Sequence, residues 1–175
     1  EVRDDLPEAG TLDGVVFSGG EPLLQKHLPE AVRQVKSLGY SVGLHTSGVY
    51  PERFAHILPL LDWVGFDVKT VFDDYESVTF APGSGGKAQR SFELLLESGV
   101  NYEVRTTADP ALIEPVKLLL LARDLRARGV TCYRLQESSF MKAGYTPDIE
   151  SRIAALFEDF EIRRQSPQNL KTGTG

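Results

Sequence analysis

The fold of this chain is decided at residues 14–22, which read GVVFSGGEP. The apolar run GVVF is typical of a strand buried in a parallel sheet. The two glycines behind it, Gly19 and Gly20, carry no side chains, so a ligand can approach the backbone closely. Glu21 adds a carboxylate at this strand end, which suits a cationic or amine-bearing ligand. Alone, a strand that ends in two glycines is equally consistent with a simple tight turn, so other features must distinguish the two.

Short β-branched or apolar runs alternate with amphipathic segments along the chain. The predicted strands are residues 14–18, 40–46, 62–68, 100–107, 130–136 and 160–165. The predicted helices are residues 26–38, 51–58, 87–98, 114–128 and 148–158. Such alternation is typical of β-α-β units and a parallel sheet. Residues 72–86, which contain an Asp pair and a Gly- and Pro-rich run, are predicted to be one long mobile loop that serves as a lid.

The charged residues of the predicted strands fall on one face of each strand. Side chains alternate between the two faces, so Phe66 points one way while Asp67 and Lys69 point the other. A parallel sheet with helices on both faces would be apolar on both. We therefore expect a barrel-like curl, with helices outside and a polar lumen inside. Two explanations of the lumen stay open: a polar ligand, or a structural ion-pair network, Asp67–Lys69 with Glu103–Arg105.

The composition predicts one soluble globular domain. The chain has 175 residues, of which 41% are hydrophobic and 25% charged, and its formal net charge is −6. The chain has no run of basic residues of the kind that indicates a nucleic-acid surface. It also has no apolar stretch of the roughly 18 to 20 residues that span a bilayer. We expect a domain at residues 1–165 and a disordered tail at 166–175. The single cysteine, Cys132, excludes an internal disulfide, fits a reducing cytoplasm and is predicted to be a plain core residue.

The string SGGEP at residues 18–22 resembles the motif with which radical S-adenosylmethionine (SAM) enzymes hold the amino group of SAM. Residues 12–25, 43–48, 61–69 and 102–107 resemble segments of the activating proteins of anaerobic ribonucleoside-triphosphate reductase, in the same order and at similar spacing. The resemblance covers residues 12–136. It implies an α/β fold, namely a partial (β/α)6-type radical SAM barrel with parallel strands and outer helices.

The resemblance also implies which residues bind SAM. Gly19, Gly20 and Glu21 would hold the amino group through backbone carbonyls and the carboxylate. Lys69 would pair with the SAM carboxylate, and Asp67 would support the ribose or a monovalent cation. The implied binding set is Gly19, Gly20, Glu21, Pro22, His45, Thr46, Ser47, Asp67, Lys69 and Arg105. No acid–base catalytic residue and no metal ligand is implied within the chain.

Two residues of this set have alternative roles. Many activases carry a carboxylate where this chain has His45, which argues against a cation site. His45 would instead donate to the ribose or only fill the lumen. Arg105 would face the methionine end of SAM or a loop of the partner protein. Arg134 and Gln136 are further lumen candidates.

For the whole protein, the resemblance implies a [4Fe-4S] cluster that reduces SAM, releasing methionine and a 5′-deoxyadenosyl radical. That radical would take a hydrogen atom from a backbone glycine of anaerobic ribonucleotide reductase, with flavodoxin or ferredoxin as electron donor. The implied protein is a cytoplasmic radical SAM oxidoreductase with neither nucleic acid nor membrane among its partners. Two alternatives stay open: a pyruvate formate-lyase-type activating enzyme, and a cluster-free barrel that only binds a nucleoside or a protein partner.

One departure from the family concerns cysteine. The family holds its cluster on three cysteines spaced C-x-x-x-C-x-x-C upstream of the Gly-Gly-Glu motif, whereas this chain has one cysteine, Cys132, far downstream. A cluster needs several thiolate ligands. The chain begins at Glu1, and its first residues are predicted to be the end of a helix. We therefore expect the first strand and the cysteine loop to be cut away and the fragment alone to be inactive; a natural variant without a cluster is the alternative.

Overall fold

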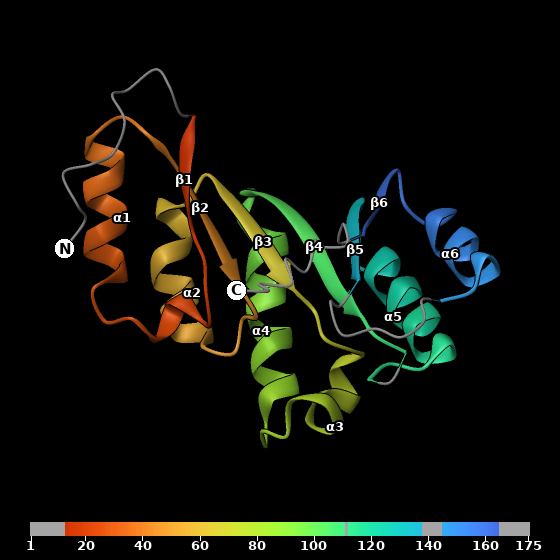
Figure 1. Cartoon of the computed structure of the whole chain (residues 1–175). Coiled ribbons are helices and arrows are strands. Elements are labelled where there is room, and N and C mark those ends of the chain that lie inside the picture. The colour runs from red at the N-terminus through yellow and green to blue at the C-terminus, as the bar shows by residue number, and fades with distance from the viewer. Residues whose placement is uncertain (1–12, 111, 138–144, 165–175) are drawn as a thin grey trace, which may run out of the picture.

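The computed structural model describes residues 13–110, 112–137 and 145–164. Within these ranges six strands form one sheet, each strand is parallel to its neighbours, and the spatial order is the chain order. The strands are β1 (Gly14–Phe17), β2 (Ser41–Thr46), β3 (Trp63–Asp67), β4 (Asn101–Ala108), β5 (Cys132–Glu137) and β6 (Asp159–Arg163). Parallel neighbours require a crossover connection, and each crossover here contains at least one helix (Figure 1).

The helices lie along the outside of the sheet (Figure 1). They are α1 (Leu28–Ser37), α2 (Pro51–Ile57), α3 (Tyr75–Thr79), α4 (Ser84–Ser98), α5 (Pro115–Ala127) and α6 (Pro147–Ala154), with the 3-10 turns η1 (Pro22–Leu24), η2 (Leu58–Leu60) and η3 (Phe72–Asp74). The six predicted strands and five predicted helices are confirmed. Their bounds differ by a few residues: α4 begins at Ser84 instead of residue 87, and α6 ends at Ala154 instead of residue 158.

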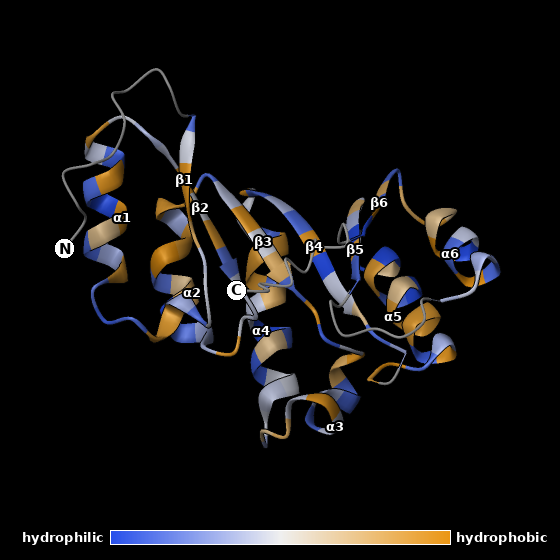
Figure 2. Cartoon of the chain, viewed as in Figure 1, coloured by the Kyte–Doolittle hydropathy of each residue, from blue (hydrophilic) through white to orange (hydrophobic). Residues whose placement is uncertain are grey.

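The face of the sheet that meets the helices is an apolar core. Val42, Leu44, Val64, Phe66 and Val104 are each 0% exposed. In Figure 2 the helices carry orange and blue sides, as expected for amphipathic helices that cover a sheet. The opposite face of the strands carries the polar residues described below. The predicted α/β architecture, parallel strands with outer helices and a polar inner face, is therefore confirmed as that of a partial (β/α)6 barrel.

The prediction of one long mobile loop at residues 72–86 is wrong. The segment forms η3, α3 and the first turn of α4. Phe72 is 7% exposed and Tyr75 is 0% exposed, so both fix the segment against the core. Gly85 packs directly against the Phe72 carbonyl, and the Tyr75 hydroxyl accepts a hydrogen bond from the Lys69 amide at 3.0 Å. Turn-forming residues dominate the local composition and hide these two aromatic anchors.

The prediction that Cys132 is a plain core residue is also wrong. Cys132 is half-buried at the start of β5, on the polar face, where burial raises the pKa of its thiol to about 11. The tail predicted at residues 166–175 and the helix end predicted at the first residues lie outside the described ranges, so the domain bounds stay predictions. Among the described residues, no helix has the length and apolar character needed to cross a membrane.

Candidate functional site

β1 ends in a turn whose backbone is accessible. Gly19 and Gly20 have φ angles of +91° and +52°, in the left-handed region that favours glycine. A Cβ atom on either residue would meet nothing within 4 Å. These positions therefore require glycine for their backbone conformation, and the turn leaves its peptide groups open to a ligand.

Glu21 ties this turn to the end of β2. Its Oε1 accepts hydrogen bonds from the Thr46 hydroxyl at 2.8 Å and the Leu23 amide at 3.2 Å. Its Oε2 accepts from the amide and the hydroxyl of Ser47 at 2.9 and 2.6 Å. A carboxylate offers about four lone-pair positions, and these protein donors use them all. The side chain thus fixes the turn, and what the turn presents to a ligand is its backbone.

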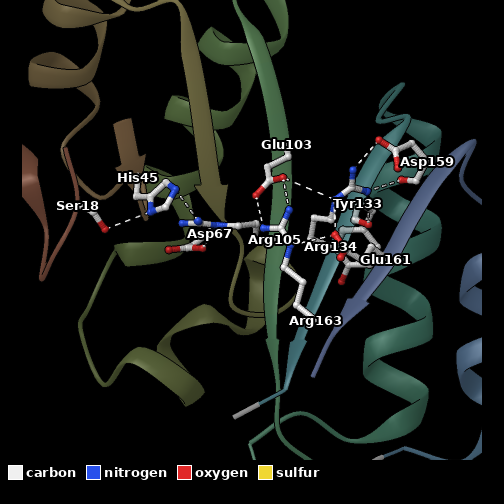
Figure 3. A network of polar contacts seen from close by, with 10 residues as sticks. All are labelled: Ser18, His45, Asp67, Glu103, Arg105, Tyr133, Arg134, Asp159, Glu161 and Arg163. Atoms are coloured by element: carbon white, nitrogen blue, oxygen red, sulfur yellow. Dashed lines mark hydrogen bonds and ion pairs between the residues drawn. The ribbon is translucent and has the colours of Figure 1, made fainter. Parts of the chain in front are cut away.

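A string of polar side chains crosses the sheet beside the turn (Figure 3). Arg105 Nε donates to Asp67 Oδ1 at 2.9 Å, Arg105 Nη1 lies 2.9 Å from His45 Nε2, and Ser18 Oγ lies 3.1 Å from His45 Nδ1. The sheet register pairs Asp67 with Arg105 and His45 with Gly65. A Cβ at position 65 would lie 2.7 Å from His45 Cδ2 and 3.1 Å from Arg105 Cζ. Glycine at this position therefore lets the imidazole and the guanidinium meet.

A second polar cluster links β4 to the two last strands (Figure 3). Arg163 donates two hydrogen bonds to the carboxylate of Glu103, at 2.7 and 2.8 Å. Arg134 Nε lies 3.6 Å from Glu103 and 3.3 Å from Glu161, and Arg134 Nη2 donates to Asp159 at 2.6 Å. The carboxylate of Glu103 is nine-tenths buried, so the arginines replace the water that it has lost.

The ion-pair network that was one of the two explanations of the lumen is present in part, with Asp67 and Arg105 as one of its pairs. Asp67 pairs with Arg105 instead of Lys69, and Glu103 pairs with Arg163 and Arg134 instead of Arg105. The reason is the register, because Asp67 stands directly opposite Arg105 whereas Glu103 stands opposite Gly65. Charges on the inner face therefore neutralise one another in two separate groups.

The predicted site residues fall into three sets, which are a group at the glycine turn, the polar string, and Lys69. Glu21, Thr46 and Ser47 form one hydrogen-bonded group next to the glycine turn, and Pro22 is the buried first residue of η1. The polar string joins His45, Asp67 and Arg105.

Lys69 stands apart from both groups. It is half-buried, and its ammonium makes no ion pair with any residue in the described ranges. Arg134 and Gln136 are half-buried on the inner face. Sequence reasoning missed Ser18 and Arg163, since only the strand register brings them to His45 and Glu103.

The pKa of His45 is lowered from its ordinary value of 6.5, first by burial and then by the positive charge of Arg105. Because the folded pKa lies below the unfolded value, the unfolded chain binds the proton first as the pH falls. The stabilising contribution is complete above about pH 6.5 and is lost on acidification through the folded pKa. We expect the free energy of unfolding of the wild type, minus that of His45→Gln, to decrease from pH 7 towards pH 5 in urea titrations. A difference that grows on acidification would contradict a neutral His45.

The described residues fit SAM better than they fit an iron–sulfur cluster. Peptide carbonyls at an open glycine turn can accept from an ammonium group, and an uncommitted lysine can pair with a carboxylate. For a cluster, the sequence offers only the thiol of Cys132, and no three His, Cys, Asp or Glu residues in the described ranges are grouped to hold a metal. We therefore derive no chemical step through a cluster bound by this chain.

Comparison with known proteins gives both a family and relatives. The model described as the Radical SAM superfamily matches residues 1–113. A protein of Methanocaldococcus jannaschii, named as a glycyl-radical enzyme activating enzyme, is 31% identical over 121 residues, which are 65% of this chain and 50% of that protein. The pyruvate formate-lyase-activating enzyme of Clostridium pasteurianum is 34% identical over 107 residues, 58% of this chain and 42% of the enzyme. The chain thus spans half or less of the length of these relatives.

Solved structures agree on the architecture. A domain of pyruvate-formate lyase-activating enzyme from Bacteroides vulgatus has a TM-score of 0.70 and 16% identity, over 85% of this chain and 98% of that one. Streptococcus suis SuiB bound to S-adenosylmethionine has a TM-score of 0.65 and 12% identity, over 87% and 38%. At such identities the likeness shows the fold alone. The family match, in contrast, extends over more than half of the residues, and the chain therefore belongs to the Radical SAM superfamily.

Proposed function

We propose that this chain forms the SAM-binding part of a glycyl-radical activase, and that the whole protein installs a glycyl radical on anaerobic ribonucleoside-triphosphate reductase. The observation that carries the proposal is the Gly19-Gly20 turn, held in place by Glu21 at the carboxyl end of β1. The carboxyl ends of parallel strands are where such folds bind ligands. The activase relatives support the reaction class, and the sequence resemblance at residues 43–48 and 102–107 supports the reductase as target.

Each residue of the site has a role in binding. The carbonyls of Gly19 and Gly20 accept from the SAM ammonium, and Lys69 pairs with its carboxylate. Glu21 acts from behind, since Thr46, Ser47 and the Leu23 amide already occupy its oxygens. Asp67 and His45 would hold the ribose, and Arg105 sets the position of both side chains.

The cofactor supplies the difficult chemistry. SAM, when it is reduced by an iron–sulfur cluster, is a source of a carbon radical, and the protein contributes orientation and the exclusion of water. No proton-transfer residue is needed in this scheme. The polar inner face would bind SAM and would leave the lumen open to a glycine loop of the partner.

Replacing Lys69 with alanine should weaken SAM binding about tenfold, because a charged hydrogen bond to the carboxylate is lost. Isothermal titration calorimetry on the chain measures this directly. Lys87→Ala is the control, since Lys87 is an exposed lysine on α4 that is not one of the predicted site residues. Equal affinity of wild type and Lys69→Ala would place the SAM carboxylate elsewhere.

The target protein is identified by electron paramagnetic resonance. The whole protein, SAM and a reductant are mixed without oxygen with either candidate partner, and a glycyl-radical signal is sought. We expect the signal on the ribonucleotide reductase. A second candidate target is pyruvate formate-lyase, which the name of the Clostridium pasteurianum relative favours. A radical on that enzyme alone would select it, and SAM cleavage with a radical on neither would exclude both.

A further inference from the structure

The hydrogens of the polar string have only one consistent arrangement. An arginine guanidinium donates hydrogen bonds and never accepts them. Nη1 of Arg105 lies 2.9 Å from His45 Nε2, so Nε2 must accept through its lone pair. A neutral imidazole carries one N–H, which then has to sit on Nδ1. Nδ1 lies 3.1 Å from Ser18 Oγ, so the ring donates and the serine oxygen accepts.

Arg105 cannot turn away to relieve this requirement. Its Nε is held by Asp67 Oδ1 at 2.9 Å, and its side chain is 6% exposed. There is no spare room at Gly65 beside the imidazole of His45 and the guanidinium of Arg105, since an added Cβ would come within 3.1 Å of both. The imidazole also lies against Trp63, with ring centroids 5.4 Å apart. The string is therefore packed in one geometry.

The charges facing His45 come from three strands. Arg105 and Glu103 lie on β4, Asp67 on β3 and Arg163 on β6. Arg105 is the one in direct contact with a ring nitrogen, and a proton on Nε2 would face its Nη1 donor at 2.9 Å. The geometry alone thus disfavours the doubly protonated ring, whatever the balance of the more distant charges.

We propose that Arg105, by holding His45 in the Nδ1–H form, makes Ser18 a hydrogen-bond donor to the ligand of the Gly19-Gly20 turn. Ser18 is exposed and immediately precedes this turn. Its oxygen accepts from His45, and no other partner of its hydroxyl lies among the described residues. The serine hydrogen is therefore free to point at an oxygen acceptor.

Glycine carbonyls and a serine hydroxyl side by side suit a particular chemical class. The carbonyls accept from an ammonium group, and the hydroxyl donates to a neighbouring carboxylate oxygen. This combination recognises the α-amino acid end of a molecule. The identification of this molecule as SAM rests on the proposed function. The hydrogen-bond arrangement of the polar string is independent of it.

Long-range ¹H–¹⁵N NMR of the imidazole rings tests the string without any ligand. His45 should show the pattern of a neutral ring with its hydrogen on Nδ1. His27 and His56, both exposed, are internal references for histidines in water. Arg105→Met should shift His45 away from this pattern and leave the two references unchanged. An Nε2–H pattern for His45 in the wild type would overturn the proposal.

Calorimetry with SAM then tests the role of Ser18. Ser18→Ala should weaken binding about fivefold, the loss of one hydrogen bond of ordinary strength. Ser37→Ala should leave binding unchanged, because the Ser37 hydroxyl donates to the Gln34 carbonyl of its own helix. The loss caused by Arg105→Met should be smaller when Ser18 is already alanine, since Arg105 acts partly through that hydroxyl.

The outcomes separate this inference from the proposed function. If the wild type binds SAM and Ser18→Ala binds it equally well, the serine role is wrong while the SAM site stands. If the wild type does not bind SAM, the proposed function fails, and the NMR pattern still decides whether Arg105 sets the hydrogen of His45. Additive losses for the Ser18 and Arg105 variants would exclude the coupling.

Discussion

Gly48→Ala should lower the free energy of unfolding by about 3 kcal/mol. Gly48 has a φ of +71°, where an added Cβ costs about 1 to 2 kcal/mol. The Cβ would also overlap the Phe66 ring and lie 2.9 Å from Ser91 Cβ. Phe66 and Ser91 are both 0% exposed, so neither side chain borders solvent. Overpacking of this kind destabilises the fold by a further amount of about 1 to 3 kcal/mol. Urea denaturation followed by circular dichroism measures the loss.

Gly83→Ala is the matched control for this prediction. Gly83 has the same φ of +71°, but a Cβ there would meet nothing within 4 Å, so only the backbone cost of about 1 to 2 kcal/mol applies. Equal losses in the two variants would show that the core yields around position 48. The Gly48 amide donates to Thr46 Oγ1 at 3.0 Å, and Thr46 in turn donates to Glu21. We therefore expect Gly48→Ala, and not Gly83→Ala, to weaken SAM binding as well.

The sheet and its helices could be predicted because their signals are local. Apolar runs alternate with amphipathic segments, and this order alone implies parallel strands joined by helices. Strand parity then assigned Phe66 to the buried face and Asp67 to the inner face, as the structure has them. The region of the binding turn followed from the same logic, since parallel strands gather their carboxyl ends at one edge.

Partners within the site could not be predicted in this way. Strand parity gives the face on which a side chain lies but not the register between neighbouring strands. It could therefore not tell whether Asp67 meets Lys69 or Arg105. The contact from Arg163 to Glu103 spans β5 and requires the register of two strand pairs. Nor does a motif reveal how many donors surround Glu21. These features depend on contacts between residues far apart in the chain.

The prediction for residues 72–86 was wrong for a different reason. Gly, Pro and Asp are common in turns, and the segment does contain turns. What fixes it is the burial of Phe72 and Tyr75, two residues whose spacing is too short to give a periodic signal. The segment therefore supports the end of β3 through the Tyr75–Lys69 hydrogen bond and is part of the framework of the site.

Glu103→Gln should lower the free energy of unfolding by about 2 to 3 kcal/mol, the range for losing charged hydrogen bonds and one member of a buried ion pair. The amide that replaces one carboxylate oxygen would point an N–H at Arg163, which now donates to both oxygens at 2.7 and 2.8 Å. Asp148→Asn is an isosteric control on an exposed helix pair, with Arg152 at 3.5 Å, and should change stability by less than about 0.5 kcal/mol.

The same variant decides between the two explanations of the polar lumen. Arg163 already donates to both carboxylate oxygens of Glu103, and Arg134 lies within ion-pair distance of it although its buried Nε makes no hydrogen bond. The carboxylate therefore needs no ligand to justify its burial. We therefore expect Glu103→Gln to bind SAM within twofold of the wild type, roughly 0.4 kcal/mol, despite its lower stability. Lys69→Ala should behave in the opposite way, with normal stability and weak binding, because its ammonium has no ion pair to lose within the described ranges. Stability close to that of the wild type together with a tenfold loss of SAM affinity in Glu103→Gln would show instead that the carboxylate is held for the ligand.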